Sequence, residues 1–263
     1  MNKIPVIGTA VVNSSYWVSR LIMSVDFPVE NFVIINNNGR GEIDSELDNL
    51  KTLNKKFIDN IKVCHMPANI GCSGAWNLII KCFMNSPYWI IVNDDVYFGP
   101  GILEEFYDKI NSDPDIGMIH GAAGDFNLGA WDLFLIRDSI VQQFGLFDEN
   151  CYPAYMEDAD YIMRFAHRPI KKIAGLSNKY YHGFLDSSGY YEEKGGSQTK
   201  KSDPSLSSKM DECIGINFGY MHEKWGPGWR TCCPYQHPYN DTSIPITYTK
   251  YDLQFVRSKH LGF

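Results

Sequence analysis

Apolar, β-branched runs alternate with segments of helical periodicity through the first hundred residues. A short apolar run bounded by turn-forming residues predicts a buried strand, and apolar residues spaced three or four apart predict a helix. The predicted strands span residues 4–12, 31–35, 60–66 and 88–92, and the predicted helices span 16–25, 43–53 and 75–84. This alternation is typical of a mostly parallel sheet covered by helices on both faces, so we expect an α/β fold.

The pattern is less regular in the rest of the chain. We expect helices at 100–111 and 158–166, strands at 117–121 and 132–136, and one or two helices within 204–220. Residues 187–203 are rich in Gly, Ser, Lys and Glu and have no apolar period, which predicts a long loop, and no period is evident after residue 226. A long loop in a compact domain tends to be a functional lid or disordered.

Polar clusters follow three of the predicted strands, at residues 36–38, 69–71 and 93–95. Ligands of open parallel sheets bind beyond the carboxyl ends of the strands. The second cluster opens a segment, residues 69–77, whose glycines allow a backbone to approach a ligand closely. The sequence therefore predicts a ligand site at this edge of the sheet.

The third cluster, Asn93-Asp94-Asp95, carries the first candidate chemistry. Mg²⁺ and Mn²⁺ prefer carboxylate oxygens, and a divalent cation stabilises the charge that develops on a departing diphosphate. Asp95 is the candidate metal ligand, with Asn93 and Asp94 available for sugar or ribose hydroxyls. An Asp pair after a strand also fits a simple turn or helix cap.

A second acidic motif contains Glu157, Asp158 and Asp160 at a predicted helix start. A helix N-terminus favours ionised carboxylates, and a carboxylate beside a reacting carbon can accept a proton as general base. N-terminal capping alone would explain the same pattern. His182 is a candidate to complete a metal site as neutral imidazole, although a lone histidine also fits a surface or core position.

Composition and charge exclude several classes of function. The 263 residues carry a formal net charge of −7, so binding of nucleic acid through its phosphates is not expected. Neither a signal peptide nor an apolar run long enough for a membrane span is present, and the seven scattered cysteines lack zinc-ligand spacing. We therefore expect a cytoplasmic protein with reduced thiols.

In their order along the chain, these motifs resemble those of family 2 glycosyltransferases and their GT-A relatives, including rhamnosyltransferase-like members. The resemblance covers roughly residues 4–226. The matching blocks are residues 69–77, Asn93-Asp94-Asp95-Val96 with Pro100-Gly101, residues 134–137, residues 144–149, residues 157–161 with Arg164, His182, and Lys224-Trp225-Gly226.

The resemblance implies a GT-A fold, a Rossmann-like α/β architecture, and transfer of a sugar from a nucleoside diphosphate to an acceptor hydroxyl of a glycan or polysaccharide. It implies that Asp95 and His182 bind Mn²⁺ or Mg²⁺. It also implies that Asp158 is the general base, with Glu157 as the alternative. The implied nucleotide-sugar contacts are Thr9, Val11, Asn36, Asn38, Asn69, Gly71, Gly74, Asn77, Asn93 and Asp94. Where the family commonly has an acidic residue after the second strand, this chain has Asn36-Asn37-Asn38.

The expected organisation is a catalytic core in residues 1–185, with the donor half in 1–98 and the acceptor half in 99–185. Residues 186–263 are expected to form a flexible loop and an extension that completes the active site. Two alternatives share the fold. A sugar-phosphate nucleotidyltransferase would carry a Gly-rich, Arg-containing loop after the first strand, where this chain has Asn13-Ser14-Ser15. A non-catalytic binding protein would not need the carboxylates at both sites.

Overall fold

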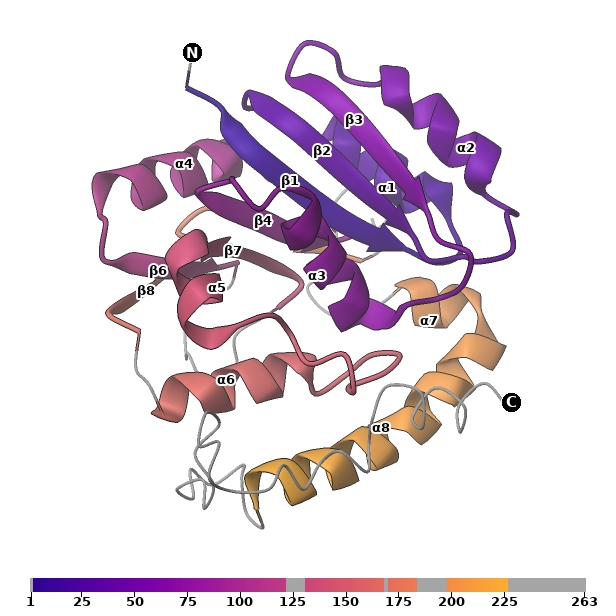
Figure 1. Cartoon of the computed structure of the whole chain (residues 1–263). Coiled ribbons are helices and arrows are strands. Elements are labelled where there is room, and N and C mark those ends of the chain that lie inside the picture. Colours follow the sequence, from indigo (N-terminus) through magenta and orange to yellow (C-terminus); the bar gives the residue numbers. More distant parts are fainter. Residues whose placement is uncertain (1, 122–130, 168–169, 184–197, 227–263) are drawn as a thin grey trace.

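The chain folds into a sheet covered on both faces by helices, with a long helix crossing below one edge (Figure 1). The computed structural model describes residues 2–121, 131–167, 170–183 and 198–226. The strands are β1 Ile4–Val11, β2 Val29–Asn36, β3 Ile58–His65, β4 Tyr88–Asn93, β5 Val96–Tyr97, β6 Ile116–His120, β7 Leu133–Arg137, β8 Lys172–Gly175 and β9 Tyr181–His182. The helices are α1 Ser15–Met23, α2 Asp44–Asn49, the short 3₁₀ helix η1 Leu50–Thr52, α3 Gly71–Cys82, α4 Ile102–Ser112, α5 Asp138–Phe144, α6 Glu157–His167, α7 Gln198–Ser202 and α8 Pro204–Trp225.

The central sheet has seven strands in the order β3-β2-β1-β4-β7-β6-β8. The β1–β2, β2–β3, β1–β4 and β6–β8 pairs are parallel, and β7 is antiparallel to both β4 and β6. The strand order reverses at β1, since β2 lies on one side of it and β4 on the other. The crevice at such a switch point is where open α/β sheets bind ligands.

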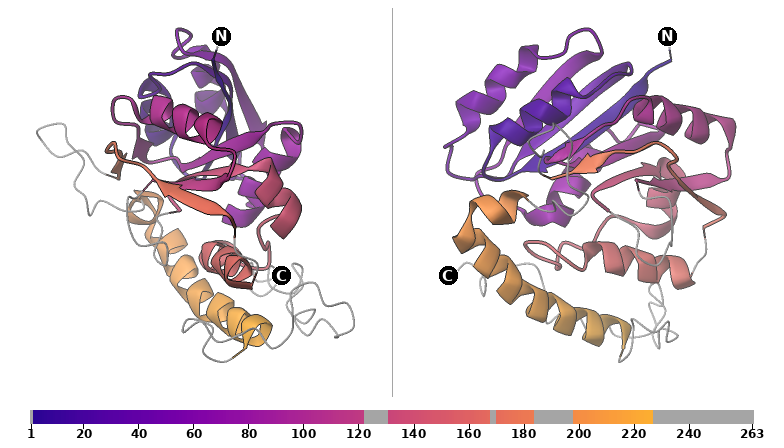
Figure 2. Two further views of the ribbon diagram at one scale, coloured as in Figure 1. Left: turned by 90° about the vertical axis from the view of Figure 1, so that its left-hand side faces the viewer. Right: turned by 180° about the vertical axis from the view of Figure 1, so that it is seen from behind.

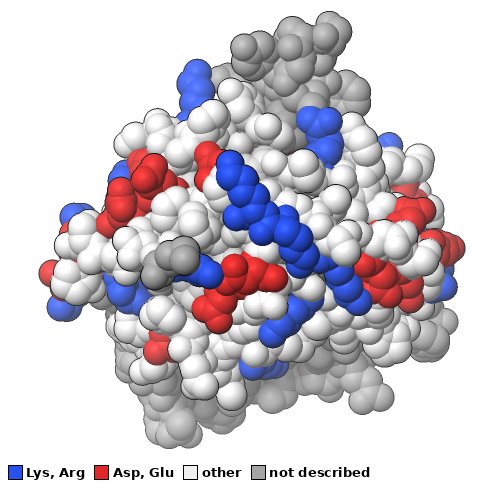
Figure 3. All heavy atoms as spheres, turned by 90° about the horizontal axis from the view of Figure 1, so that it is seen from above, with Lys and Arg blue, Asp and Glu red and all other residues white. Residues whose placement is uncertain are grey.

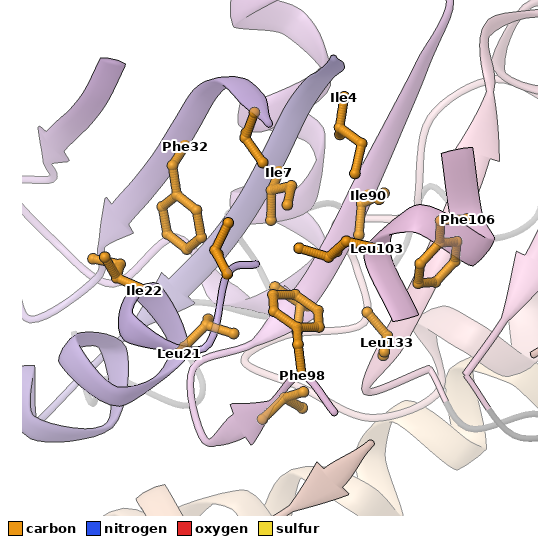
Figure 4. Packing of buried hydrophobic residues seen from close by; sticks show 14 of the residues in the cluster. Ile4, Ile7, Leu21, Ile22, Phe32, Ile90, Phe98, Leu103, Phe106 and Leu133 are labelled. Carbon is orange, nitrogen blue, oxygen red and sulfur yellow. The ribbon is translucent and has the colours of Figure 1, made fainter. Parts of the chain in front are cut away.

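Each face of the sheet buries one large apolar cluster. On one face α1, α2 and α4 pack against strand residues, with Leu21, Phe32, Ile90 and Phe106 all fully buried (Figure 4). On the other face α3, α5 and α6 pack around aromatic rings, among them Trp76. Burial of this kind removes apolar surface from water on both sides, which explains why the strands read as almost continuous apolar runs.

Two elements outside the sheet complete the described structure. The short strands β5 and β9 pair antiparallel, with Val96 opposite His182. Gly99 permits this approach, because a Cβ there would lie 1.9 Å from the Lys179 carbonyl oxygen. Helices α7 and α8 run from beside α3 along the underside of the core, and α8 lies next to α6 in all three ribbon views (Figures 1 and 2).

The predicted fold class is confirmed, with corrections to individual elements. Helix α3 begins at Gly71 instead of residue 75, because the Asn69 side-chain oxygen accepts the Gly71 N–H at 2.8 Å and Gly71 takes a positive φ of 79° that starts the helix. Of the predicted loop 187–203, residues 198–202 form α7, and residues 187–197 lie outside the described part. The prediction of no period after residue 226 also falls there.

The surface opposite α8 mixes both signs of charge. Basic and acidic side chains lie next to one another over the face seen from above (Figure 3). Ion pairs at the surface include Lys3–Asp59 and Lys171–Asp115. No helix in the described ranges has the length and apolar character needed to cross a bilayer.

Candidate functional site

A cavity of about 320 Å³ opens at the switch point of the sheet. Its wall combines the ends of β1 and β4, the start of α3, the first turn of α6, His182 on β9, and helices α7 and α8. Its lining residues include Val12, Asn37, Asn69, Gly71, Cys72, Asn93, Asp94, Asp95, Trp131, Asp132, Tyr155, Glu157, Asp158, His182, Thr199, Leu206 and Met210. Segments from the whole described chain therefore meet at one place.

Asp95 and His182 face each other at this wall. The β5–β9 pairing brings them together, and the Asp95 carbonyl oxygen accepts the Gly183 N–H at 2.9 Å. The His182 Nε2 atom lies 3.1 Å from Asp95 Oδ1. Both candidate metal ligands are thus fixed by backbone pairing instead of by flexible loops alone.

His182 is also held from its other ring nitrogen. Nδ1 lies 3.0 Å from Asp132 Oδ2, and Asp132 Oδ1 accepts a hydrogen bond from the Tyr180 hydroxyl at 2.9 Å. Burial opposes the charged form of His182, but the hydrogen bonds to Asp132 and Asp95 outweigh it and raise the pKa of His182 to about 10. The imidazole is therefore bridged between two carboxylates.

The second carboxylate oxygen of Asp95 is held by the C-terminal extension. Asp95 Oδ2 accepts the backbone N–H of Gln198 at 2.7 Å, at the start of α7. The Asn13 side-chain amide donates to the Thr199 carbonyl oxygen at 3.1 Å, which joins α7 to the end of β1. Helix α7 consequently covers the cavity at the candidate metal ligand.

Neighbouring carboxylates perturb each other at the end of β4. Burial, followed by the charge of Asp95, raises the pKa of Asp94 well above its ordinary value. For Asp95, burial favours the neutral form, but the hydrogen bond and charge of His182 win and lower its pKa. Asp95 is therefore the anionic member of the pair.

The first turn of α6 contributes Glu157 and Asp158. Glu157 is 5% exposed, and burial, followed by the charge of Asp158, raises its pKa to about 8. Glu157 lines the cavity, and no described residue forms a hydrogen bond with its Oε2 atom. Asp158 is half-buried; burial raises its pKa, and its Oδ1 accepts the Ala159 N–H at 2.7 Å. Asp158 thus keeps one oxygen for a ligand and is the more accessible of the two.

The turn before α6 is conformationally unusual. Tyr155 and Met156 both adopt positive φ, 74° and 78°, a region that costs non-glycine residues free energy and needs support from surrounding structure. The fully buried Asn217 of α8 donates to the carbonyl oxygens of Ala154 and Tyr155 at 3.0 and 3.1 Å. Helix α8 therefore supports the turn that presents Asp158.

A second buried set of charges, which we call the paired cluster, lies where α8 contacts α6. It consists of Asp148, Asp160, Arg164 and Lys224. Lys224 Nζ lies 2.5 Å from Asp148 and 2.6 Å from Asp160, and Arg164 lies 2.5 Å from Asp160. Tyr220 donates to Asp148 and Trp225 Nε1 donates to Asp160 at 2.8 Å.

The cavity fits a divalent cation held jointly by protein and ligand. Across the residues placed in the structure, no three His, Cys, Asp or Glu side chains converge as a complete metal site. Asp95 and His182 supply one anionic oxygen and one imidazole nitrogen 3.1 Å apart at the cavity wall. Mg²⁺-type sites often take one or two protein carboxylates and complete the shell with phosphates and water, so this pair suits a cation that arrives with a diphosphate.

The predicted site residues divide into two groups. Eight line the cavity, namely Asn69, Gly71, Asn93, Asp94, Asp95, Glu157, Asp158 and His182. Asn38 lines an adjoining pocket of about 300 Å³ together with Arg40 and Lys209. The cavity and this pocket share Val12, Asn37 and Asn69, so they form one continuous cleft.

The other five predicted contacts lie outside that cleft. Thr9 and Val11 are fully buried in β1, and Gly74 packs against Ile70 inside α3. The Asn36 amide donates to Asp44 at 2.6 Å. The Asn77 amide donates to the Phe147 carbonyl oxygen and accepts the Phe147 N–H, both at 2.9 Å. These hydrogen bonds give Asn36 and Asn77 roles in loop support.

Several cavity residues were given no role of their own by sequence reasoning, among them Asn37, Cys72 and Asp132. Asn37 lines the cleft directly after β2, which ends at Asn36. Successive side chains of a strand point to opposite sides, so the available signal was that Asn36 and Asn37 would point in different directions. Asp132 and Cys72 also line the cavity. Asp132 is the first residue of a predicted strand and belongs to no motif, so only the tertiary contact with His182 reveals it.

Comparisons with known proteins agree with this geometry. A model of Glycosyl transferase family 2 matches residues 26–167, more than half of the chain. A galactofuranosyl glycosyltransferase of Leishmania donovani is 22% identical over 244 residues, covering 68% of this chain. The chain spans 56% of the length of that relative.

Solved structures share the fold at low sequence identity. The mannosyltransferase PcManGT from Pyrobaculum calidifontis, in complex with GDP-Man and Mn²⁺, matches with a TM-score of 0.54 and 12% identity over 72% of this chain and 58% of its own. S. aureus TarS 1–349 in complex with UDP-GlcNAc matches with a TM-score of 0.53 and 14% identity over 84% of this chain and 67% of its own. GalNAc-T7 with UDP, GalNAc and Mn²⁺ matches with a TM-score of 0.56 and 13% identity over 98% of this chain and 54% of its own.

Proposed function

Since the chain belongs to the family 2 glycosyltransferases, we propose that it transfers a sugar from a nucleoside diphosphate to an acceptor hydroxyl, with inversion at the anomeric carbon and with a divalent cation. One observation carries the proposal. Asp158, Asp95 and His182, which lie far apart in sequence, line a single cavity at the switch point of the sheet.

Asp158 is proposed as the general base. A base must lie within hydrogen-bond reach of the proton that it accepts, and Asp158 is the half-buried carboxylate at the cavity with a free oxygen. Burial raises the pKa of Asp158, which improves the carboxylate as a proton acceptor. Glu157, with a pKa of about 8, is largely protonated at neutral pH and is better suited to donating a hydrogen bond than to removing a proton.

Asp95 and His182 are proposed to hold the cation, Mn²⁺ or Mg²⁺, beside the diphosphate of the donor. When bound, the cation supplies positive charge that offsets the negative charge growing on the leaving diphosphate. Two structural neighbours, PcManGT and GalNAc-T7, were solved with Mn²⁺, which supports a divalent ion. Asp94 and Asn93 then remain for hydroxyl groups of the sugar or ribose.

The proposed organisation assigns residues 1–98 to the donor and 99–185 to the acceptor, with the extension 186–263 completing the site. Support comes from Thr199, Leu206 and Met210, through which α7 and α8 line the cavity. The donor is proposed to be a hexosyl or pentosyl nucleotide. The first compounds to test are UDP-GlcNAc and GDP-Man, which are bound in two structural neighbours, and a galactofuranosyl nucleotide, which the name of the sequence relative suggests.

The test has two stages. Thermal-shift measurements with Mn²⁺ and a panel of UDP and GDP sugars identify the donor, and release of nucleoside diphosphate with and without saccharide acceptors measures transfer. Asp158→Asn is expected to lower transfer by about 10²–10⁴-fold with donor binding retained, because general base catalysis typically contributes that much.

Asp138→Asn is the matched control. Asp138 also lies in the first turn of a helix, α5, so it reproduces any change in helix capping without touching the cavity. Near-wild-type transfer by Asp158→Asn would remove the proposed base. Donor binding without turnover or hydrolysis by the wild-type chain would instead support the alternative of a non-catalytic binding protein.

A further inference from the structure

We propose that Asp132 is a positioning residue of the metal site, which holds His182 through Nδ1 so that Nε2 is presented to a cation beside Asp95. This inference rests on the proposed function, because it assumes that Asp95 and His182 bind a divalent ion. No motif in the sequence assigns a role to Asp132, and neither does any match to a known protein reported above.

The geometry gives the two ring nitrogens of His182 different neighbours. Nδ1 lies 3.0 Å from Asp132 Oδ2, and Nε2 lies 3.1 Å from Asp95 Oδ1. Metal binding needs the neutral imidazole, so a cation at Nε2 takes the place of the proton there, while the N–H at Nδ1 still donates to Asp132 and directs the Nε2 lone pair to the space beside Asp95. Hydrogen bonding at one imidazole nitrogen in this way selects the nitrogen that binds metal.

Asp132 is itself fixed by further contacts. Its Oδ1 accepts the Tyr180 hydroxyl at 2.9 Å, and its carbonyl oxygen accepts the Asn93 N–H at 2.7 Å. Its side chain is 11% exposed. Because both carboxylate oxygens already have hydrogen-bond partners, Asp132 is better placed to orient His182 than to bind the cation directly.

The backbone contact matters for a second reason. Asn93 begins the Asn93-Asp94-Asp95 turn, so Asp132 links both halves of the candidate metal site: it touches His182 with its side chain and the turn carrying Asp95 with its main chain. Substituting the side chain removes the first contact and preserves the second. The effect of the carboxylate on His182 is therefore open to separate measurement.

A double-mutant cycle on the full chain tests the proposal. The affinity for Mn²⁺, with and without UDP, is measured by electron paramagnetic resonance of the free ion for wild type, Asp132→Ala, His182→Ala and the double variant. Asp132→Ala is expected to weaken Mn²⁺ binding about 10–100-fold, the usual cost of losing such a partner. The double variant is expected to bind no more weakly than His182→Ala, because Asp132 acts through the imidazole.

Two further variants separate positioning from folding. Asp132→Asn keeps an acceptor oxygen for Nδ1 and is expected to lose less affinity than Asp132→Ala. Tyr180→Phe removes one contact that fixes Asp132 but leaves the contact with His182 in place, so it is also expected to lose less affinity than Asp132→Ala. Thermal midpoints of all variants check the fold. Nitrogen NMR of the Mg²⁺-loaded protein is expected to show the Nδ1–H tautomer of His182 in wild type and its loss in Asp132→Ala.

The outcomes distinguish the two proposals. Unchanged Mn²⁺ affinity or an unchanged tautomer in Asp132→Ala, or losses that add in the double variant, would overturn the positioning role and leave the metal site standing. No Mn²⁺ binding by the wild-type chain, or full binding by His182→Ala, would overturn the metal site itself and the positioning role with it.

Discussion

Two clusters of buried charge both include residues from the first turn of α6, and they differ in how their carboxylates are satisfied. In the paired cluster two carboxylates meet two cations, Arg164 and Lys224, at ion-pair distance. Burial alone would raise the pKa of Asp148, yet the charge of Lys224 holds it well below its usual range. Every charge there has a partner.

The second set, which we call the cavity cluster, consists of Asp94, Asp95, Glu157 and Asp158. His182 is the cationic group that contacts it within the described ranges, and it contacts Asp95 alone. The pKa values of Asp94, Glu157 and Asp158 are all raised, with burial as the largest cause. Excess carboxylates in a cavity are electrostatically suited to a cation, whereas the paired cluster is suited to holding two helices together.

The comparison teaches that a motif rich in acidic residues has two different uses within four positions. Glu157 and Asp158 face the cavity, while Asp160 faces α8 and is fully buried against Lys224, Arg164 and Trp225. All three are acidic residues in the first turn of α6. The partner brought by the rest of the fold decides which carboxylate is structural.

The largest expected effect is on the paired cluster. Lys224→Met leaves Asp148 without its cation and Asp160 with only one, so we expect a loss of about 3–5 kcal/mol in the free energy of unfolding, the typical cost of breaking a buried ion pair. Urea denaturation measures it. Lys171→Met, which removes an exposed partner of Asp115, is the control and is expected to leave stability unchanged. Equal effects of the two substitutions would contradict the contrast.

In the cavity cluster, removing an ionisable group is expected to increase stability, and the gain is expected to depend on pH. The pKa of Glu157 is about 8 in the folded chain and 4.5 as the ordinary value, so between these pH values the folded state holds a proton that the unfolded state has lost. Stability therefore falls as pH rises from 4.5 to 8. Glu157→Gln removes this slope and should gain stability relative to wild type, on the order of a few kcal/mol at pH 8 and far less at pH 5.

Unfolding of both proteins at pH 5 and pH 8 checks this prediction. Glu104→Gln, an exposed substitution in the first turn of α4, serves as the control and should show the same pH dependence as wild type. If the stability of Glu157→Gln fell with pH as steeply as that of wild type, the Glu157 carboxyl would not be held protonated by its site.

A divalent cation should act on only one of the two clusters. Mn²⁺ with UDP at about 100 times the dissociation constant is expected to stabilise wild type by about 2–3 kcal/mol and to stabilise Asp95→Asn by almost nothing. Lys224→Met, if folded, should keep the full gain, because its cluster is outside the cavity wall. Thermal scans with Mn²⁺ and with EDTA give the comparison, and a gain that survives in Asp95→Asn would move the metal elsewhere.

The smallest expected effect concerns the support of the turn between the clusters. Asn217→Ala leaves the carbonyl oxygens of Ala154 and Tyr155 without their donor, which should cost about 1–2 kcal/mol of stability. Transfer should fall further than stability explains, because the positive φ of Tyr155 and Met156 loses its support just before Asp158. Asn111→Ala, which removes one exposed side-chain bond to Tyr107, is the control and should leave transfer unchanged.

The apolar pattern was sufficient to predict most of the sheet and the helices on its faces. Strands such as Tyr88–Asn93 are buried on both sides and read as continuous apolar runs, so β1 to β4 were expected close to their observed positions. The two-residue strands β5 and β9 were not expected, because a pairing of that length leaves no periodic signal. The helical state of residues 198–202 was also missed, since its polar residues are ordered by contacts with Asp95 and Asn13.

The candidate site residues also divide into those with a local sequence signal and those that only tertiary contacts reveal. Asp95, Asp158 and His182 were recognised from motifs, and the cavity contains all three. Asn77 was expected at the donor but supports the Phe147 backbone, because its direction within α3 depends on tertiary packing. Asp132 was unrecognisable for the converse reason: its neighbours come from β4 and β9, remote in sequence.

The pairing of β5 with β9 has a consequence for how the protein is made. During synthesis the ribosome releases the N-terminal strands and Asp95 well before Tyr181–His182, so the nascent half has the carboxylate and lacks the imidazole. A chain arrested before β9 would display the Asp94-Asp95 turn with no partner strand beside it. The two proposed metal ligands therefore come together only after β9 has been made.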